Sequence, residues 1–235
     1  MALVKNGKKL GVLGGLGPAA SAEFLRQLAE KCPAQKDQDH PVVYMIADCD
    51  IPDRTTAIFG KGESPLPKIK ADLLQLVEMG ADVLAVPCNT AHYFIDQITE
   101  ELPVPLIHIV DATVLAAKAL SPEGAWMLST TGTRACGLYQ ECAKKHNYTL
   151  YIPNDEQSKL AMEAITCIKA NNYSEAGKVL KGMVEELWAE RDLPVMTACT
   201  ELPLAYDASG LPQEKAVSSI GALVAATVKE LYVEK

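Results

Sequence analysis

Short apolar runs alternate with amphipathic stretches along most of the chain, and this alternation predicts strands that are each followed by helices. Between the apolar runs, hydrophobic residues recur at helical spacing over 19–31, 64–79, 135–146, 160–169, 174–189 and about 218–233. Continuous apolar strands separated by helices are typical of an α/β protein with mostly parallel sheets. The expected strands are 10–13, 42–47, 83–87, 106–110, 125–128, 150–152 and 195–198.

The two halves of the chain repeat one order of turns. A turn of small residues follows a strand at 13–17 and again at 128–133, and a cysteine turn ends a later strand at Cys88 and again at Cys199. Ligands of open α/β sheets bind beyond the carboxyl ends of the strands, where all four turns are expected. We therefore expect two similar domains facing across a cleft: 1–111 plus 208–235, which carries Cys88, and 112–207, which carries Cys199.

Composition limits the classes of partner. The 235 residues are 49% hydrophobic and 22% charged, as in ordinary globular proteins. The net charge of −8 and the lack of a basic cluster argue against nucleic acid or an anionic membrane surface as the main partner. No apolar run reaches the roughly 20 residues of a membrane span, and the N-terminus lacks the apolar core of a signal peptide. We expect a cytoplasmic protein whose seven cysteines are free thiols.

Cys88 and Cys199 are the candidate reactive groups. Each is expected at a strand end and is followed by residues that favour a helix start. The positive end of a helix dipole can lower the pKa of a thiol from about 8.5 to roughly 3.5–7.5. A thiolate on one face of a carbon centre and a thiol on the other could then invert that centre by moving one proton off and another on. The alternative is a pair of small buried core cysteines.

Polar side chains next to these cysteines could bind an anion. Asn89, Thr90 and Thr200 are candidate donors to a carboxylate at a helix N-terminus, although plain N-capping explains them equally well. Glu201 could orient a neighbouring group or bind a substrate ammonium, or it could only complement the helix dipole.

Two cations each follow a predicted strand. Arg54 and Lys159 could bind a second carboxylate at the rim of the cleft, and the alternative for each is a solvated surface charge. Arg54 separates two classes of substrate, because a second anion-binding group in the cleft favours a dicarboxylate.

A cofactor or metal site has weaker support. Residues 15–20 fit the dinucleotide pattern G-x-G-x-x-A, but the nearest acid that could end the next strand, Asp48, lies about 30 residues on instead of about 20. His92 follows Cys88 by four residues and His146 follows Cys142 by four, yet no set of three or four zinc ligands is apparent. These histidines and the remaining cysteines are interpreted as structural: Cys32, Cys49, Cys136, Cys142 and Cys167.

Six short motifs occur in an order that resembles the aspartate/glutamate racemase family, whose members work without pyridoxal phosphate. They are residues 11–17, 51–55, 87–92, 128–133, 155–157 and 199–202, and together they extend over nearly the whole chain. Two departures favour the aspartate-racemase-like branch. Glutamate racemases of cell-wall synthesis have Asp-Ser where this chain has Gly14 and Gly15, and they have His where it has Glu201.

The resemblance implies two Rossmann-like domains with four-stranded, mostly parallel sheets related by pseudo-twofold symmetry, and an active site in the interdomain cleft. It also implies a homodimer that uses no cofactor. Arg54 and Lys159 resemble the residues that hold the side-chain carboxylate of the substrate. The α-carboxylate is held in such enzymes at the positions of Asn89, Thr90, Thr130, Thr131 and Thr133.

The expected function is cofactor-independent racemisation of aspartate or glutamate, with Cys88 and Cys199 exchanging the α-proton. Two alternatives share the fold: a hydantoin racemase and a maleate isomerase-like enzyme. Two others belong to different classes: a nucleotide-dependent oxidoreductase, and an amino-acid-binding protein that performs no catalysis.

Overall fold

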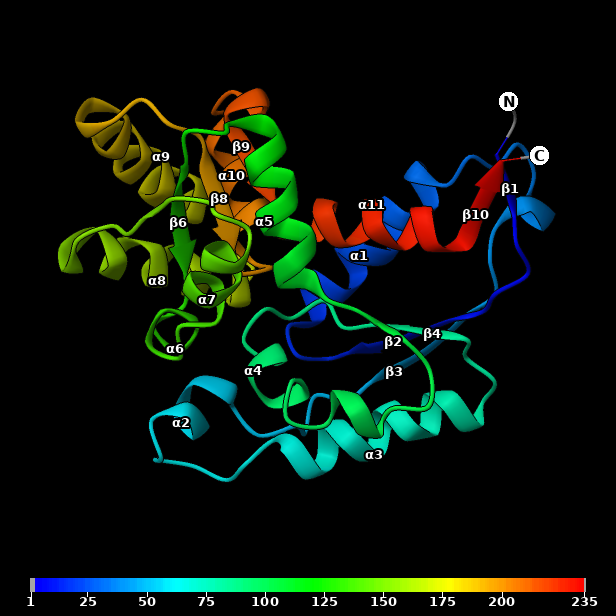
Figure 1. The fold of residues 1–235 in the computed structure, drawn as a ribbon. Coiled ribbons are helices and arrows are strands. Elements are labelled where there is room, and N and C mark those ends of the chain that lie inside the picture. The colour runs from blue at the N-terminus through cyan, green and yellow to red at the C-terminus, as the bar shows by residue number, and fades with distance from the viewer. Residues whose placement is uncertain (1–2, 235) are drawn as a thin grey trace.

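The computed structural model describes residues 3–234 and contains two four-stranded parallel sheets of identical topology (Figure 1). In each sheet the first strand along the chain lies between the second and the third, with the fourth at the edge. This shared order confirms the predicted α/β class. The first sheet runs β3 (Val43–Ala47), β2 (Leu10–Gly14), β4 (Val83–Ala85), β5 (Leu106–Ile107), and the second runs β7 (Leu150–Tyr151), β6 (Ala125–Ser129), β8 (Val195–Ala198), β9 (Ala216–Ser218).

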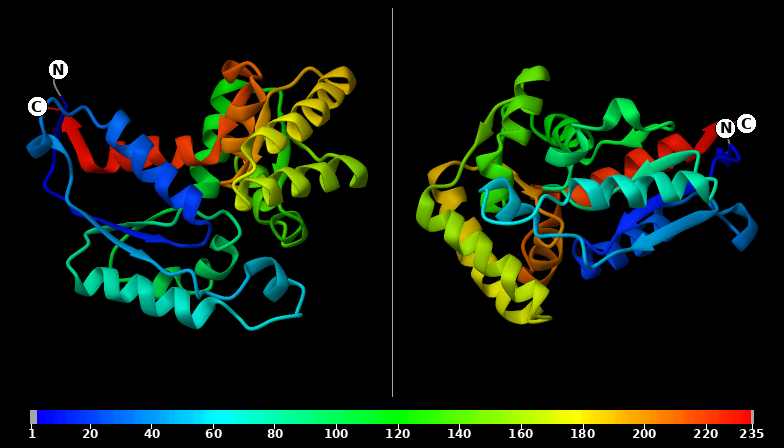
Figure 2. Two further views of the ribbon diagram at one scale, coloured as in Figure 1. Left: turned by 180° about the vertical axis from the view of Figure 1, so that it is seen from behind. Right: turned by 90° about the horizontal axis from the view of Figure 1, so that it is seen from below.

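Helices cover both faces of each sheet. On the first sheet, α1 (Pro18–Lys31) and α11 (Ser219–Leu231) lie on one face and α3 (Leu66–Glu78) on the other (Figure 2). On the second sheet, one face is covered by α5 and α7 and the other by α8, α9 and α10. These five helices are α5 (Ile109–Leu120), α7 (Leu138–Lys145), α8 (Asp155–Lys169), α9 (Tyr173–Glu190) and α10 (Leu202–Ser209).

The two halves exchange their last helices. Helix α5 follows the first sheet but packs on the second, and α11 follows the second sheet but packs beside α1 (Figure 1). One apolar core therefore runs through both halves. It includes four fully buried side chains: Phe24, Val114, Met196 and Leu223. Full burial of such side chains contributes about 1.5–3 kcal/mol each, which stabilises the halves against each other.

The chain ends lie together, because β1 (Leu3–Lys5) pairs antiparallel with β10 (Tyr232–Glu234). The sequence patterns did not predict these two strands. None of the helices within residues 3–234 has both the length and the apolarity needed to cross a bilayer. The remaining short elements are η1 (Asp37–Asp39), α2 (Arg54–Ile58), α4 (His92–Ile95), η2 (Thr99–Glu101), α6 (Thr131–Ala135) and η3 (Gln213–Lys215).

Several predicted boundaries change for identifiable reasons. The helix expected over 135–146 begins only at Leu138, because Gly137 adopts a left-handed backbone with φ 72° after the short α6. The helix expected over 160–169 begins at Asp155, because Asn154 and Gln157 form a capping box. The strand expected over 106–110 ends at Ile107, where α5 follows. The expected domain limits stay a prediction, but β9 pairs with β8 and so belongs to the second sheet.

One glycine of the first turn has no room for a side chain. Gly15 has φ +85°, and a Cβ added there would lie 2.5 Å from the backbone of Asp48. We expect Gly15→Ala to lower the free energy of unfolding by about 2–4 kcal/mol, measured by urea denaturation. The matched control is Gly60→Ala, where φ is +67° but no atom lies within 4 Å, so only about 1 kcal/mol is expected. Equal losses in the two variants would contradict the steric explanation.

Candidate active site

Four turns converge at the carboxyl ends of the strands. In each sheet the turns after the first and third strands are neighbours at the topological switch point, which is the usual ligand position in such sheets. Thr90, in the first half, lies 3.2 Å from Thr130 and 2.8 Å from Thr133 of the second half, measured between hydroxyl oxygens. Thr130 also caps α6 by accepting from the Thr133 N–H. Buried hydroxyls therefore connect the two halves beside the cysteine turns.

Asn89, next to Cys88, is fixed by residues of the second half. Its Oδ1 accepts from the Tyr139 hydroxyl at 2.5 Å, and its Nδ2 donates to Ser219 Oγ at 3.1 Å. Asn89, Tyr139 and Ser219 are all buried. The Cys88 turn is consequently held against α7 and α11, and the second amide hydrogen of Asn89 is the one available for a bound anion.

His92 holds the same turn through a hydrogen bond to the backbone of Cys88. Its Nδ1 lies 2.9 Å from the carbonyl oxygen of Cys88, and the N–H of Ile109 donates to its Nε2 at 3.4 Å. Burial lowers the pKa of His92 to about 3, so the ring is neutral at physiological pH and Nδ1–H donates to the Cys88 carbonyl. His92 therefore positions the backbone of Cys88. This structural role accounts for the four-residue spacing between the two residues.

Both candidate thiols are buried, with Cys88 6% and Cys199 5% exposed. Burial raises the pKa of Cys88, and the guanidinium of Arg54 opposes this by its charge and a hydrogen bond. Burial and the charge of Glu201 raise the pKa of Cys199 well above its ordinary value, while Lys169 opposes them. Each thiol thus has one cation near it, contributed by the segment that follows the second strand of its own sheet.

The prediction that helix dipoles lower the pKa of the two thiols is wrong. The residues that cap α4 and α10 are Ala91 and Glu201, so Cys88 and Cys199 lie in the preceding turns and outside the first helical turn. In addition, α4 is only four residues long. Because dipole effects fall off within one turn, burial outweighs them at both sulfurs.

Glu201 is the charged group that the two thiols share. Cys199 Sγ donates to Glu201 Oε2 at 3.1 Å, and the Glu201 charge also raises the pKa of Cys88. Glu201 is 4% exposed and fits against the first glycine turn, since a Cβ on Gly17 would lie 2.6 Å from Glu201 Oε1. Thr200 is buried beside it, with its hydroxyl 3.5 Å from Glu201 Oε2. The close approach of Glu201 therefore accounts for the glycine at position 17, which the dinucleotide pattern had offered as a nucleotide contact.

A cavity of about 500 Å³ is lined by Arg54, Lys169 and Glu201, whereas Cys88 and Cys199 are not among the residues that line it. The Arg54 guanidinium is oriented by the carbonyl oxygens of Ile51 and Pro52, at 3.3 and 3.2 Å from Nη1. Two cations and one buried carboxylate around a single hollow complement a small zwitterion that carries a second carboxylate.

Two of the predicted binding residues are elsewhere. Lys159 has a side chain that is 71% exposed, and its ammonium pairs with Glu156 at 2.7 Å. The lysine that lines the cavity is Lys169, ten residues and about 15 Å further along α8, and Lys159 does not line it. Thr131 is exposed and lines a separate, small hollow beside Arg134, so it does not join the buried hydroxyls.

The chain is similar to known racemases along most of its length. Residues 13–227 match the model of the family described as Asp/Glu/Hydantoin racemase. The broad specificity amino-acid racemase RacX of Bacillus subtilis (strain 168) is 28% identical over 203 residues, which cover 84% of this chain and 87% of RacX. The aspartate racemase of Picrophilus torridus superposes with a TM-score of 0.85 at 28% identity, over 95% of this chain and 94% of that one. Glutamate racemase isoform RacE1 of Bacillus anthracis shares the fold, with a TM-score of 0.67 at 18% identity over 95% and 81% of the two chains.

Proposed function

The chain belongs to the Asp/Glu/Hydantoin racemase family and is an amino-acid racemase, and we propose that it inverts acidic amino acids with Cys88 and Cys199 as its two acid–base groups. One observation carries this proposal: three charged residues that line the cavity also act on the two buried thiols. Arg54 acts on Cys88, Lys169 acts on Cys199, and Glu201 acts on both.

The substrate would be bound at both of its carboxylates. Asn89 and the hydroxyls of Thr90, Thr130 and Thr133 are the donors for the α-carboxylate, and Thr200, beside Glu201, is a further candidate. Arg54 and Lys169 at the cavity are the cations for the side-chain carboxylate, and charge-assisted bonds of this kind are about twice as strong as neutral ones. Two anchors fix the α-carbon between the turns of Cys88 and Cys199.

The reaction needs only proton transfers. The thiolate of Cys88 takes the α-proton from one face, and the electron pair of the broken C–H bond spreads into the α-carboxylate. Cys199 then donates its S–H proton to the opposite face, which leaves Cys88 as a thiol and Cys199 as a thiolate. Starting from the other enantiomer reverses these roles. Donors already in place at the α-carboxylate stabilise the developing charge, so no cofactor is required.

The two environments rank the thiols by how readily each loses its proton. Burial raises the pKa of both, and at Cys88 the positive charge of Arg54 opposes this rise. The hydrogen bond from Cys199 Sγ to the carboxylate of Glu201 favours the thiol, and the same carboxylate can accept the proton when Cys199 acts as the base. We therefore assign Cys88 as the thiol that loses its proton more readily and Cys199 as the thiol that holds its proton more strongly.

The activity is tested with purified protein and a panel of single enantiomers, without added cofactor. Chiral chromatography should show racemisation of aspartate or glutamate and much slower conversion of neutral and basic amino acids. Equal rates for neutral amino acids would overturn the acidic specificity and would match the broad specificity for which RacX is named. Turnover of a hydantoin or of maleate in place of amino acids would identify one of the alternative enzymes. Binding of aspartate without any racemisation would indicate a binding protein.

The two lysines of α8 provide a matched pair of variants. Lys169→Ala should raise KM for the acidic substrate by about 10–100-fold, because a charged hydrogen bond contributes about 1.5–3 kcal/mol. Lys159→Ala should leave kcat and KM unchanged, since its side chain is exposed and pairs only with Glu156. Steady-state kinetics of both variants measures the difference. The reverse pattern would restore Lys159 to the site and remove Lys169 from it.

A further inference from the structure

A second cavity, of about 630 Å³, lies between the α4 segment and the face of α7, away from Arg54 and Glu201. Its lining carries many groups that titrate or bind metals: Asp96, His108, Asp111, Glu141, Cys142 and Lys145. Nothing in the proposed racemisation uses these side chains.

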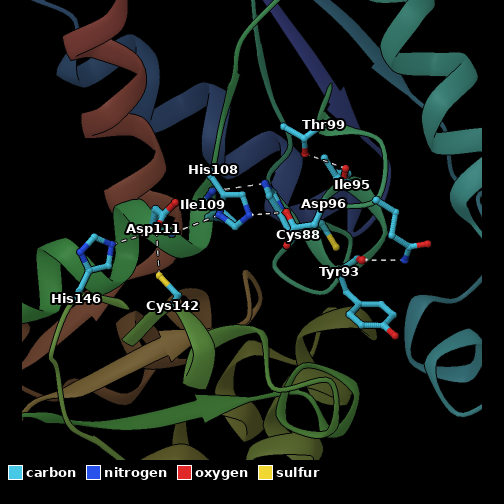
Figure 3. A network of polar contacts seen from close by, with 12 residues as sticks. Cys88, Tyr93, Ile95, Asp96, Thr99, His108, Ile109, Asp111, Cys142 and His146 are labelled. Carbon is cyan, nitrogen blue, oxygen red and sulfur yellow. Dashed lines mark hydrogen bonds and ion pairs between the residues drawn. The ribbon is translucent and has the colours of Figure 1, made fainter. Parts of the chain in front are cut away.

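Three donor atoms of different kinds lie close together beside this cavity, which Asp111 and Cys142 line (Figure 3). Asp111 lies in the first turn of α5, Cys142 lies on α7, and His146 caps the end of α7. Asp111 Oδ1 is 3.0 Å from Cys142 Sγ and 3.2 Å from His146 Nε2. All three donor atoms lie within 4.8 Å of one another.

We propose that Asp111, Cys142 and His146 form a binding site for a zinc-type divalent cation. In tetrahedral zinc sites the metal is about 2.3 Å from sulfur and about 2.0–2.1 Å from nitrogen and oxygen, so neighbouring ligand atoms are roughly 3.3–3.5 Å apart. The observed separations of 3.0 and 3.2 Å need to widen by only a few tenths of an ångström. Exposed Asp and His side chains can move by this amount, because their side chains are 51% and 30% exposed.

The mixture of donors selects the class of metal. A thiolate, an imidazole and a carboxylate suit zinc or cobalt, whereas magnesium and calcium take oxygen ligands. Cys142 and His146 are four residues apart on one helix, a spacing that places both on the same face. Coordination converts the Cys142 thiol to a thiolate, and its proton passes to solvent.

The cation would also crosslink helices α5 and α7. The ligands come from α5 and α7, and the backbone of His146 is already held by Lys118 of α5, whose ammonium donates to the His146 carbonyl at 2.7 Å. This backbone is therefore ordered before a metal arrives, which reduces the entropy lost on binding. A fourth coordination position can take water, as in zinc sites with three protein ligands.

The test uses metal-free protein in which Cys88→Ser and Cys199→Ser remove the competing thiols of the active site. Calorimetric titration with zinc chloride should show one bound ion per chain and a rise in Tm. Substitution with cobalt should give a thiolate-to-cobalt charge-transfer band. Removing a residue that only supports a metal ligand typically weakens metal affinity by about 10–100-fold. Adding Cys142→Ser or His146→Ala removes a ligand itself and should weaken zinc affinity by more than this.

Two controls separate loss of the site from loss of the fold. Cys136→Ser removes another thiol from the same cavity and should leave zinc affinity unchanged. Asp111→Asn keeps the side-chain size but removes the charge, and should weaken zinc binding while the circular dichroism spectrum stays that of the parent. Absence of zinc binding in the parent protein, or binding that survives both Cys142→Ser and His146→Ala, would overturn the proposal. Asp111 would then be a hydrogen-bond acceptor that joins α5 to α7.

Discussion

Replacement of Cys88 or Cys199 by serine is expected to lower kcat for racemisation by about 10²–10⁴-fold, the contribution of one positioned acid–base group. A serine hydroxyl can occupy the space of the thiol, but it is a far weaker acid and base near neutral pH. Both thiols are more than nine-tenths buried, so bulk water does not readily replace them. Chiral chromatography of aspartate or glutamate incubated with each variant measures the loss.

The matched control for these variants is Cys49→Ser. Cys49 lines the cavity that holds Arg54, Lys169 and Glu201, but it is exposed, and no step of the proposed reaction uses it. We expect this variant to keep the kcat of the parent protein. Undiminished racemisation in Cys88→Ser or Cys199→Ser would remove that residue from the mechanism, and a large loss in Cys49→Ser would show that the wrong thiol has been chosen.

Arg54→Gln is expected to have the second largest effect, a fall in kcat/KM of about 10²–10³-fold. Arg54 has two roles, as the cation for the substrate side chain and as the positive charge beside Cys88. Losing a charged hydrogen bond costs about 1.5–3 kcal/mol, and the weaker stabilisation of the thiolate adds to this. The loss should appear in both KM and kcat.

The pH dependence of Arg54→Gln distinguishes the two roles. A cation lowers the pKa of a nearby thiol, so its removal raises the pKa of Cys88 further. The acidic limb of the profile of kcat/KM against pH, where the thiolate forms, should therefore move to higher pH. Arg54→Lys keeps the charge and should leave this limb in place while KM rises, because the planar fork is lost. An unmoved acidic limb in Arg54→Gln would restrict Arg54 to substrate binding.

The fold could be predicted from sequence because its signals are local. Continuous apolar strands and amphipathic helices define each βα unit, and the repeated turns indicated two related halves. The exchange of α5 and α11 between the halves was less accessible, since it depends on which sheet an apolar helix packs against. The pairing of β1 with β10 joins segments more than 200 residues apart, and such pairing leaves no local pattern.

The candidate site was predictable where residues follow a strand directly. Cys88, Asn89, Thr90, Cys199 and Glu201 all lie in turns after the third strand of a sheet. Lys169 was missed because it stands at the far end of a helix, and only the three-dimensional path of α8 brings it to the cavity.

Supporting residues were harder to predict for a related reason. Tyr139 and Ser219 reach Asn89 from helices of the other half, and their side-chain types alone carry no sign of that role. The third member of the proposed cation site, Asp111, is likewise 31 residues from Cys142 in sequence, which is why spacing alone showed only a pair. The homodimer implied by the family resemblance stays a prediction.

The most direct test of the two-thiol account is the position of solvent label early in the reaction. A pure enantiomer of aspartate or glutamate is incubated in deuterated buffer, and the separated enantiomers are analysed by mass spectrometry before much has been converted. Two acid–base groups on opposite faces predict deuterium at the α-carbon of the product and protium in the unreacted substrate. A product that keeps the original protium, or equal labelling of both enantiomers from the first time point, would contradict the account.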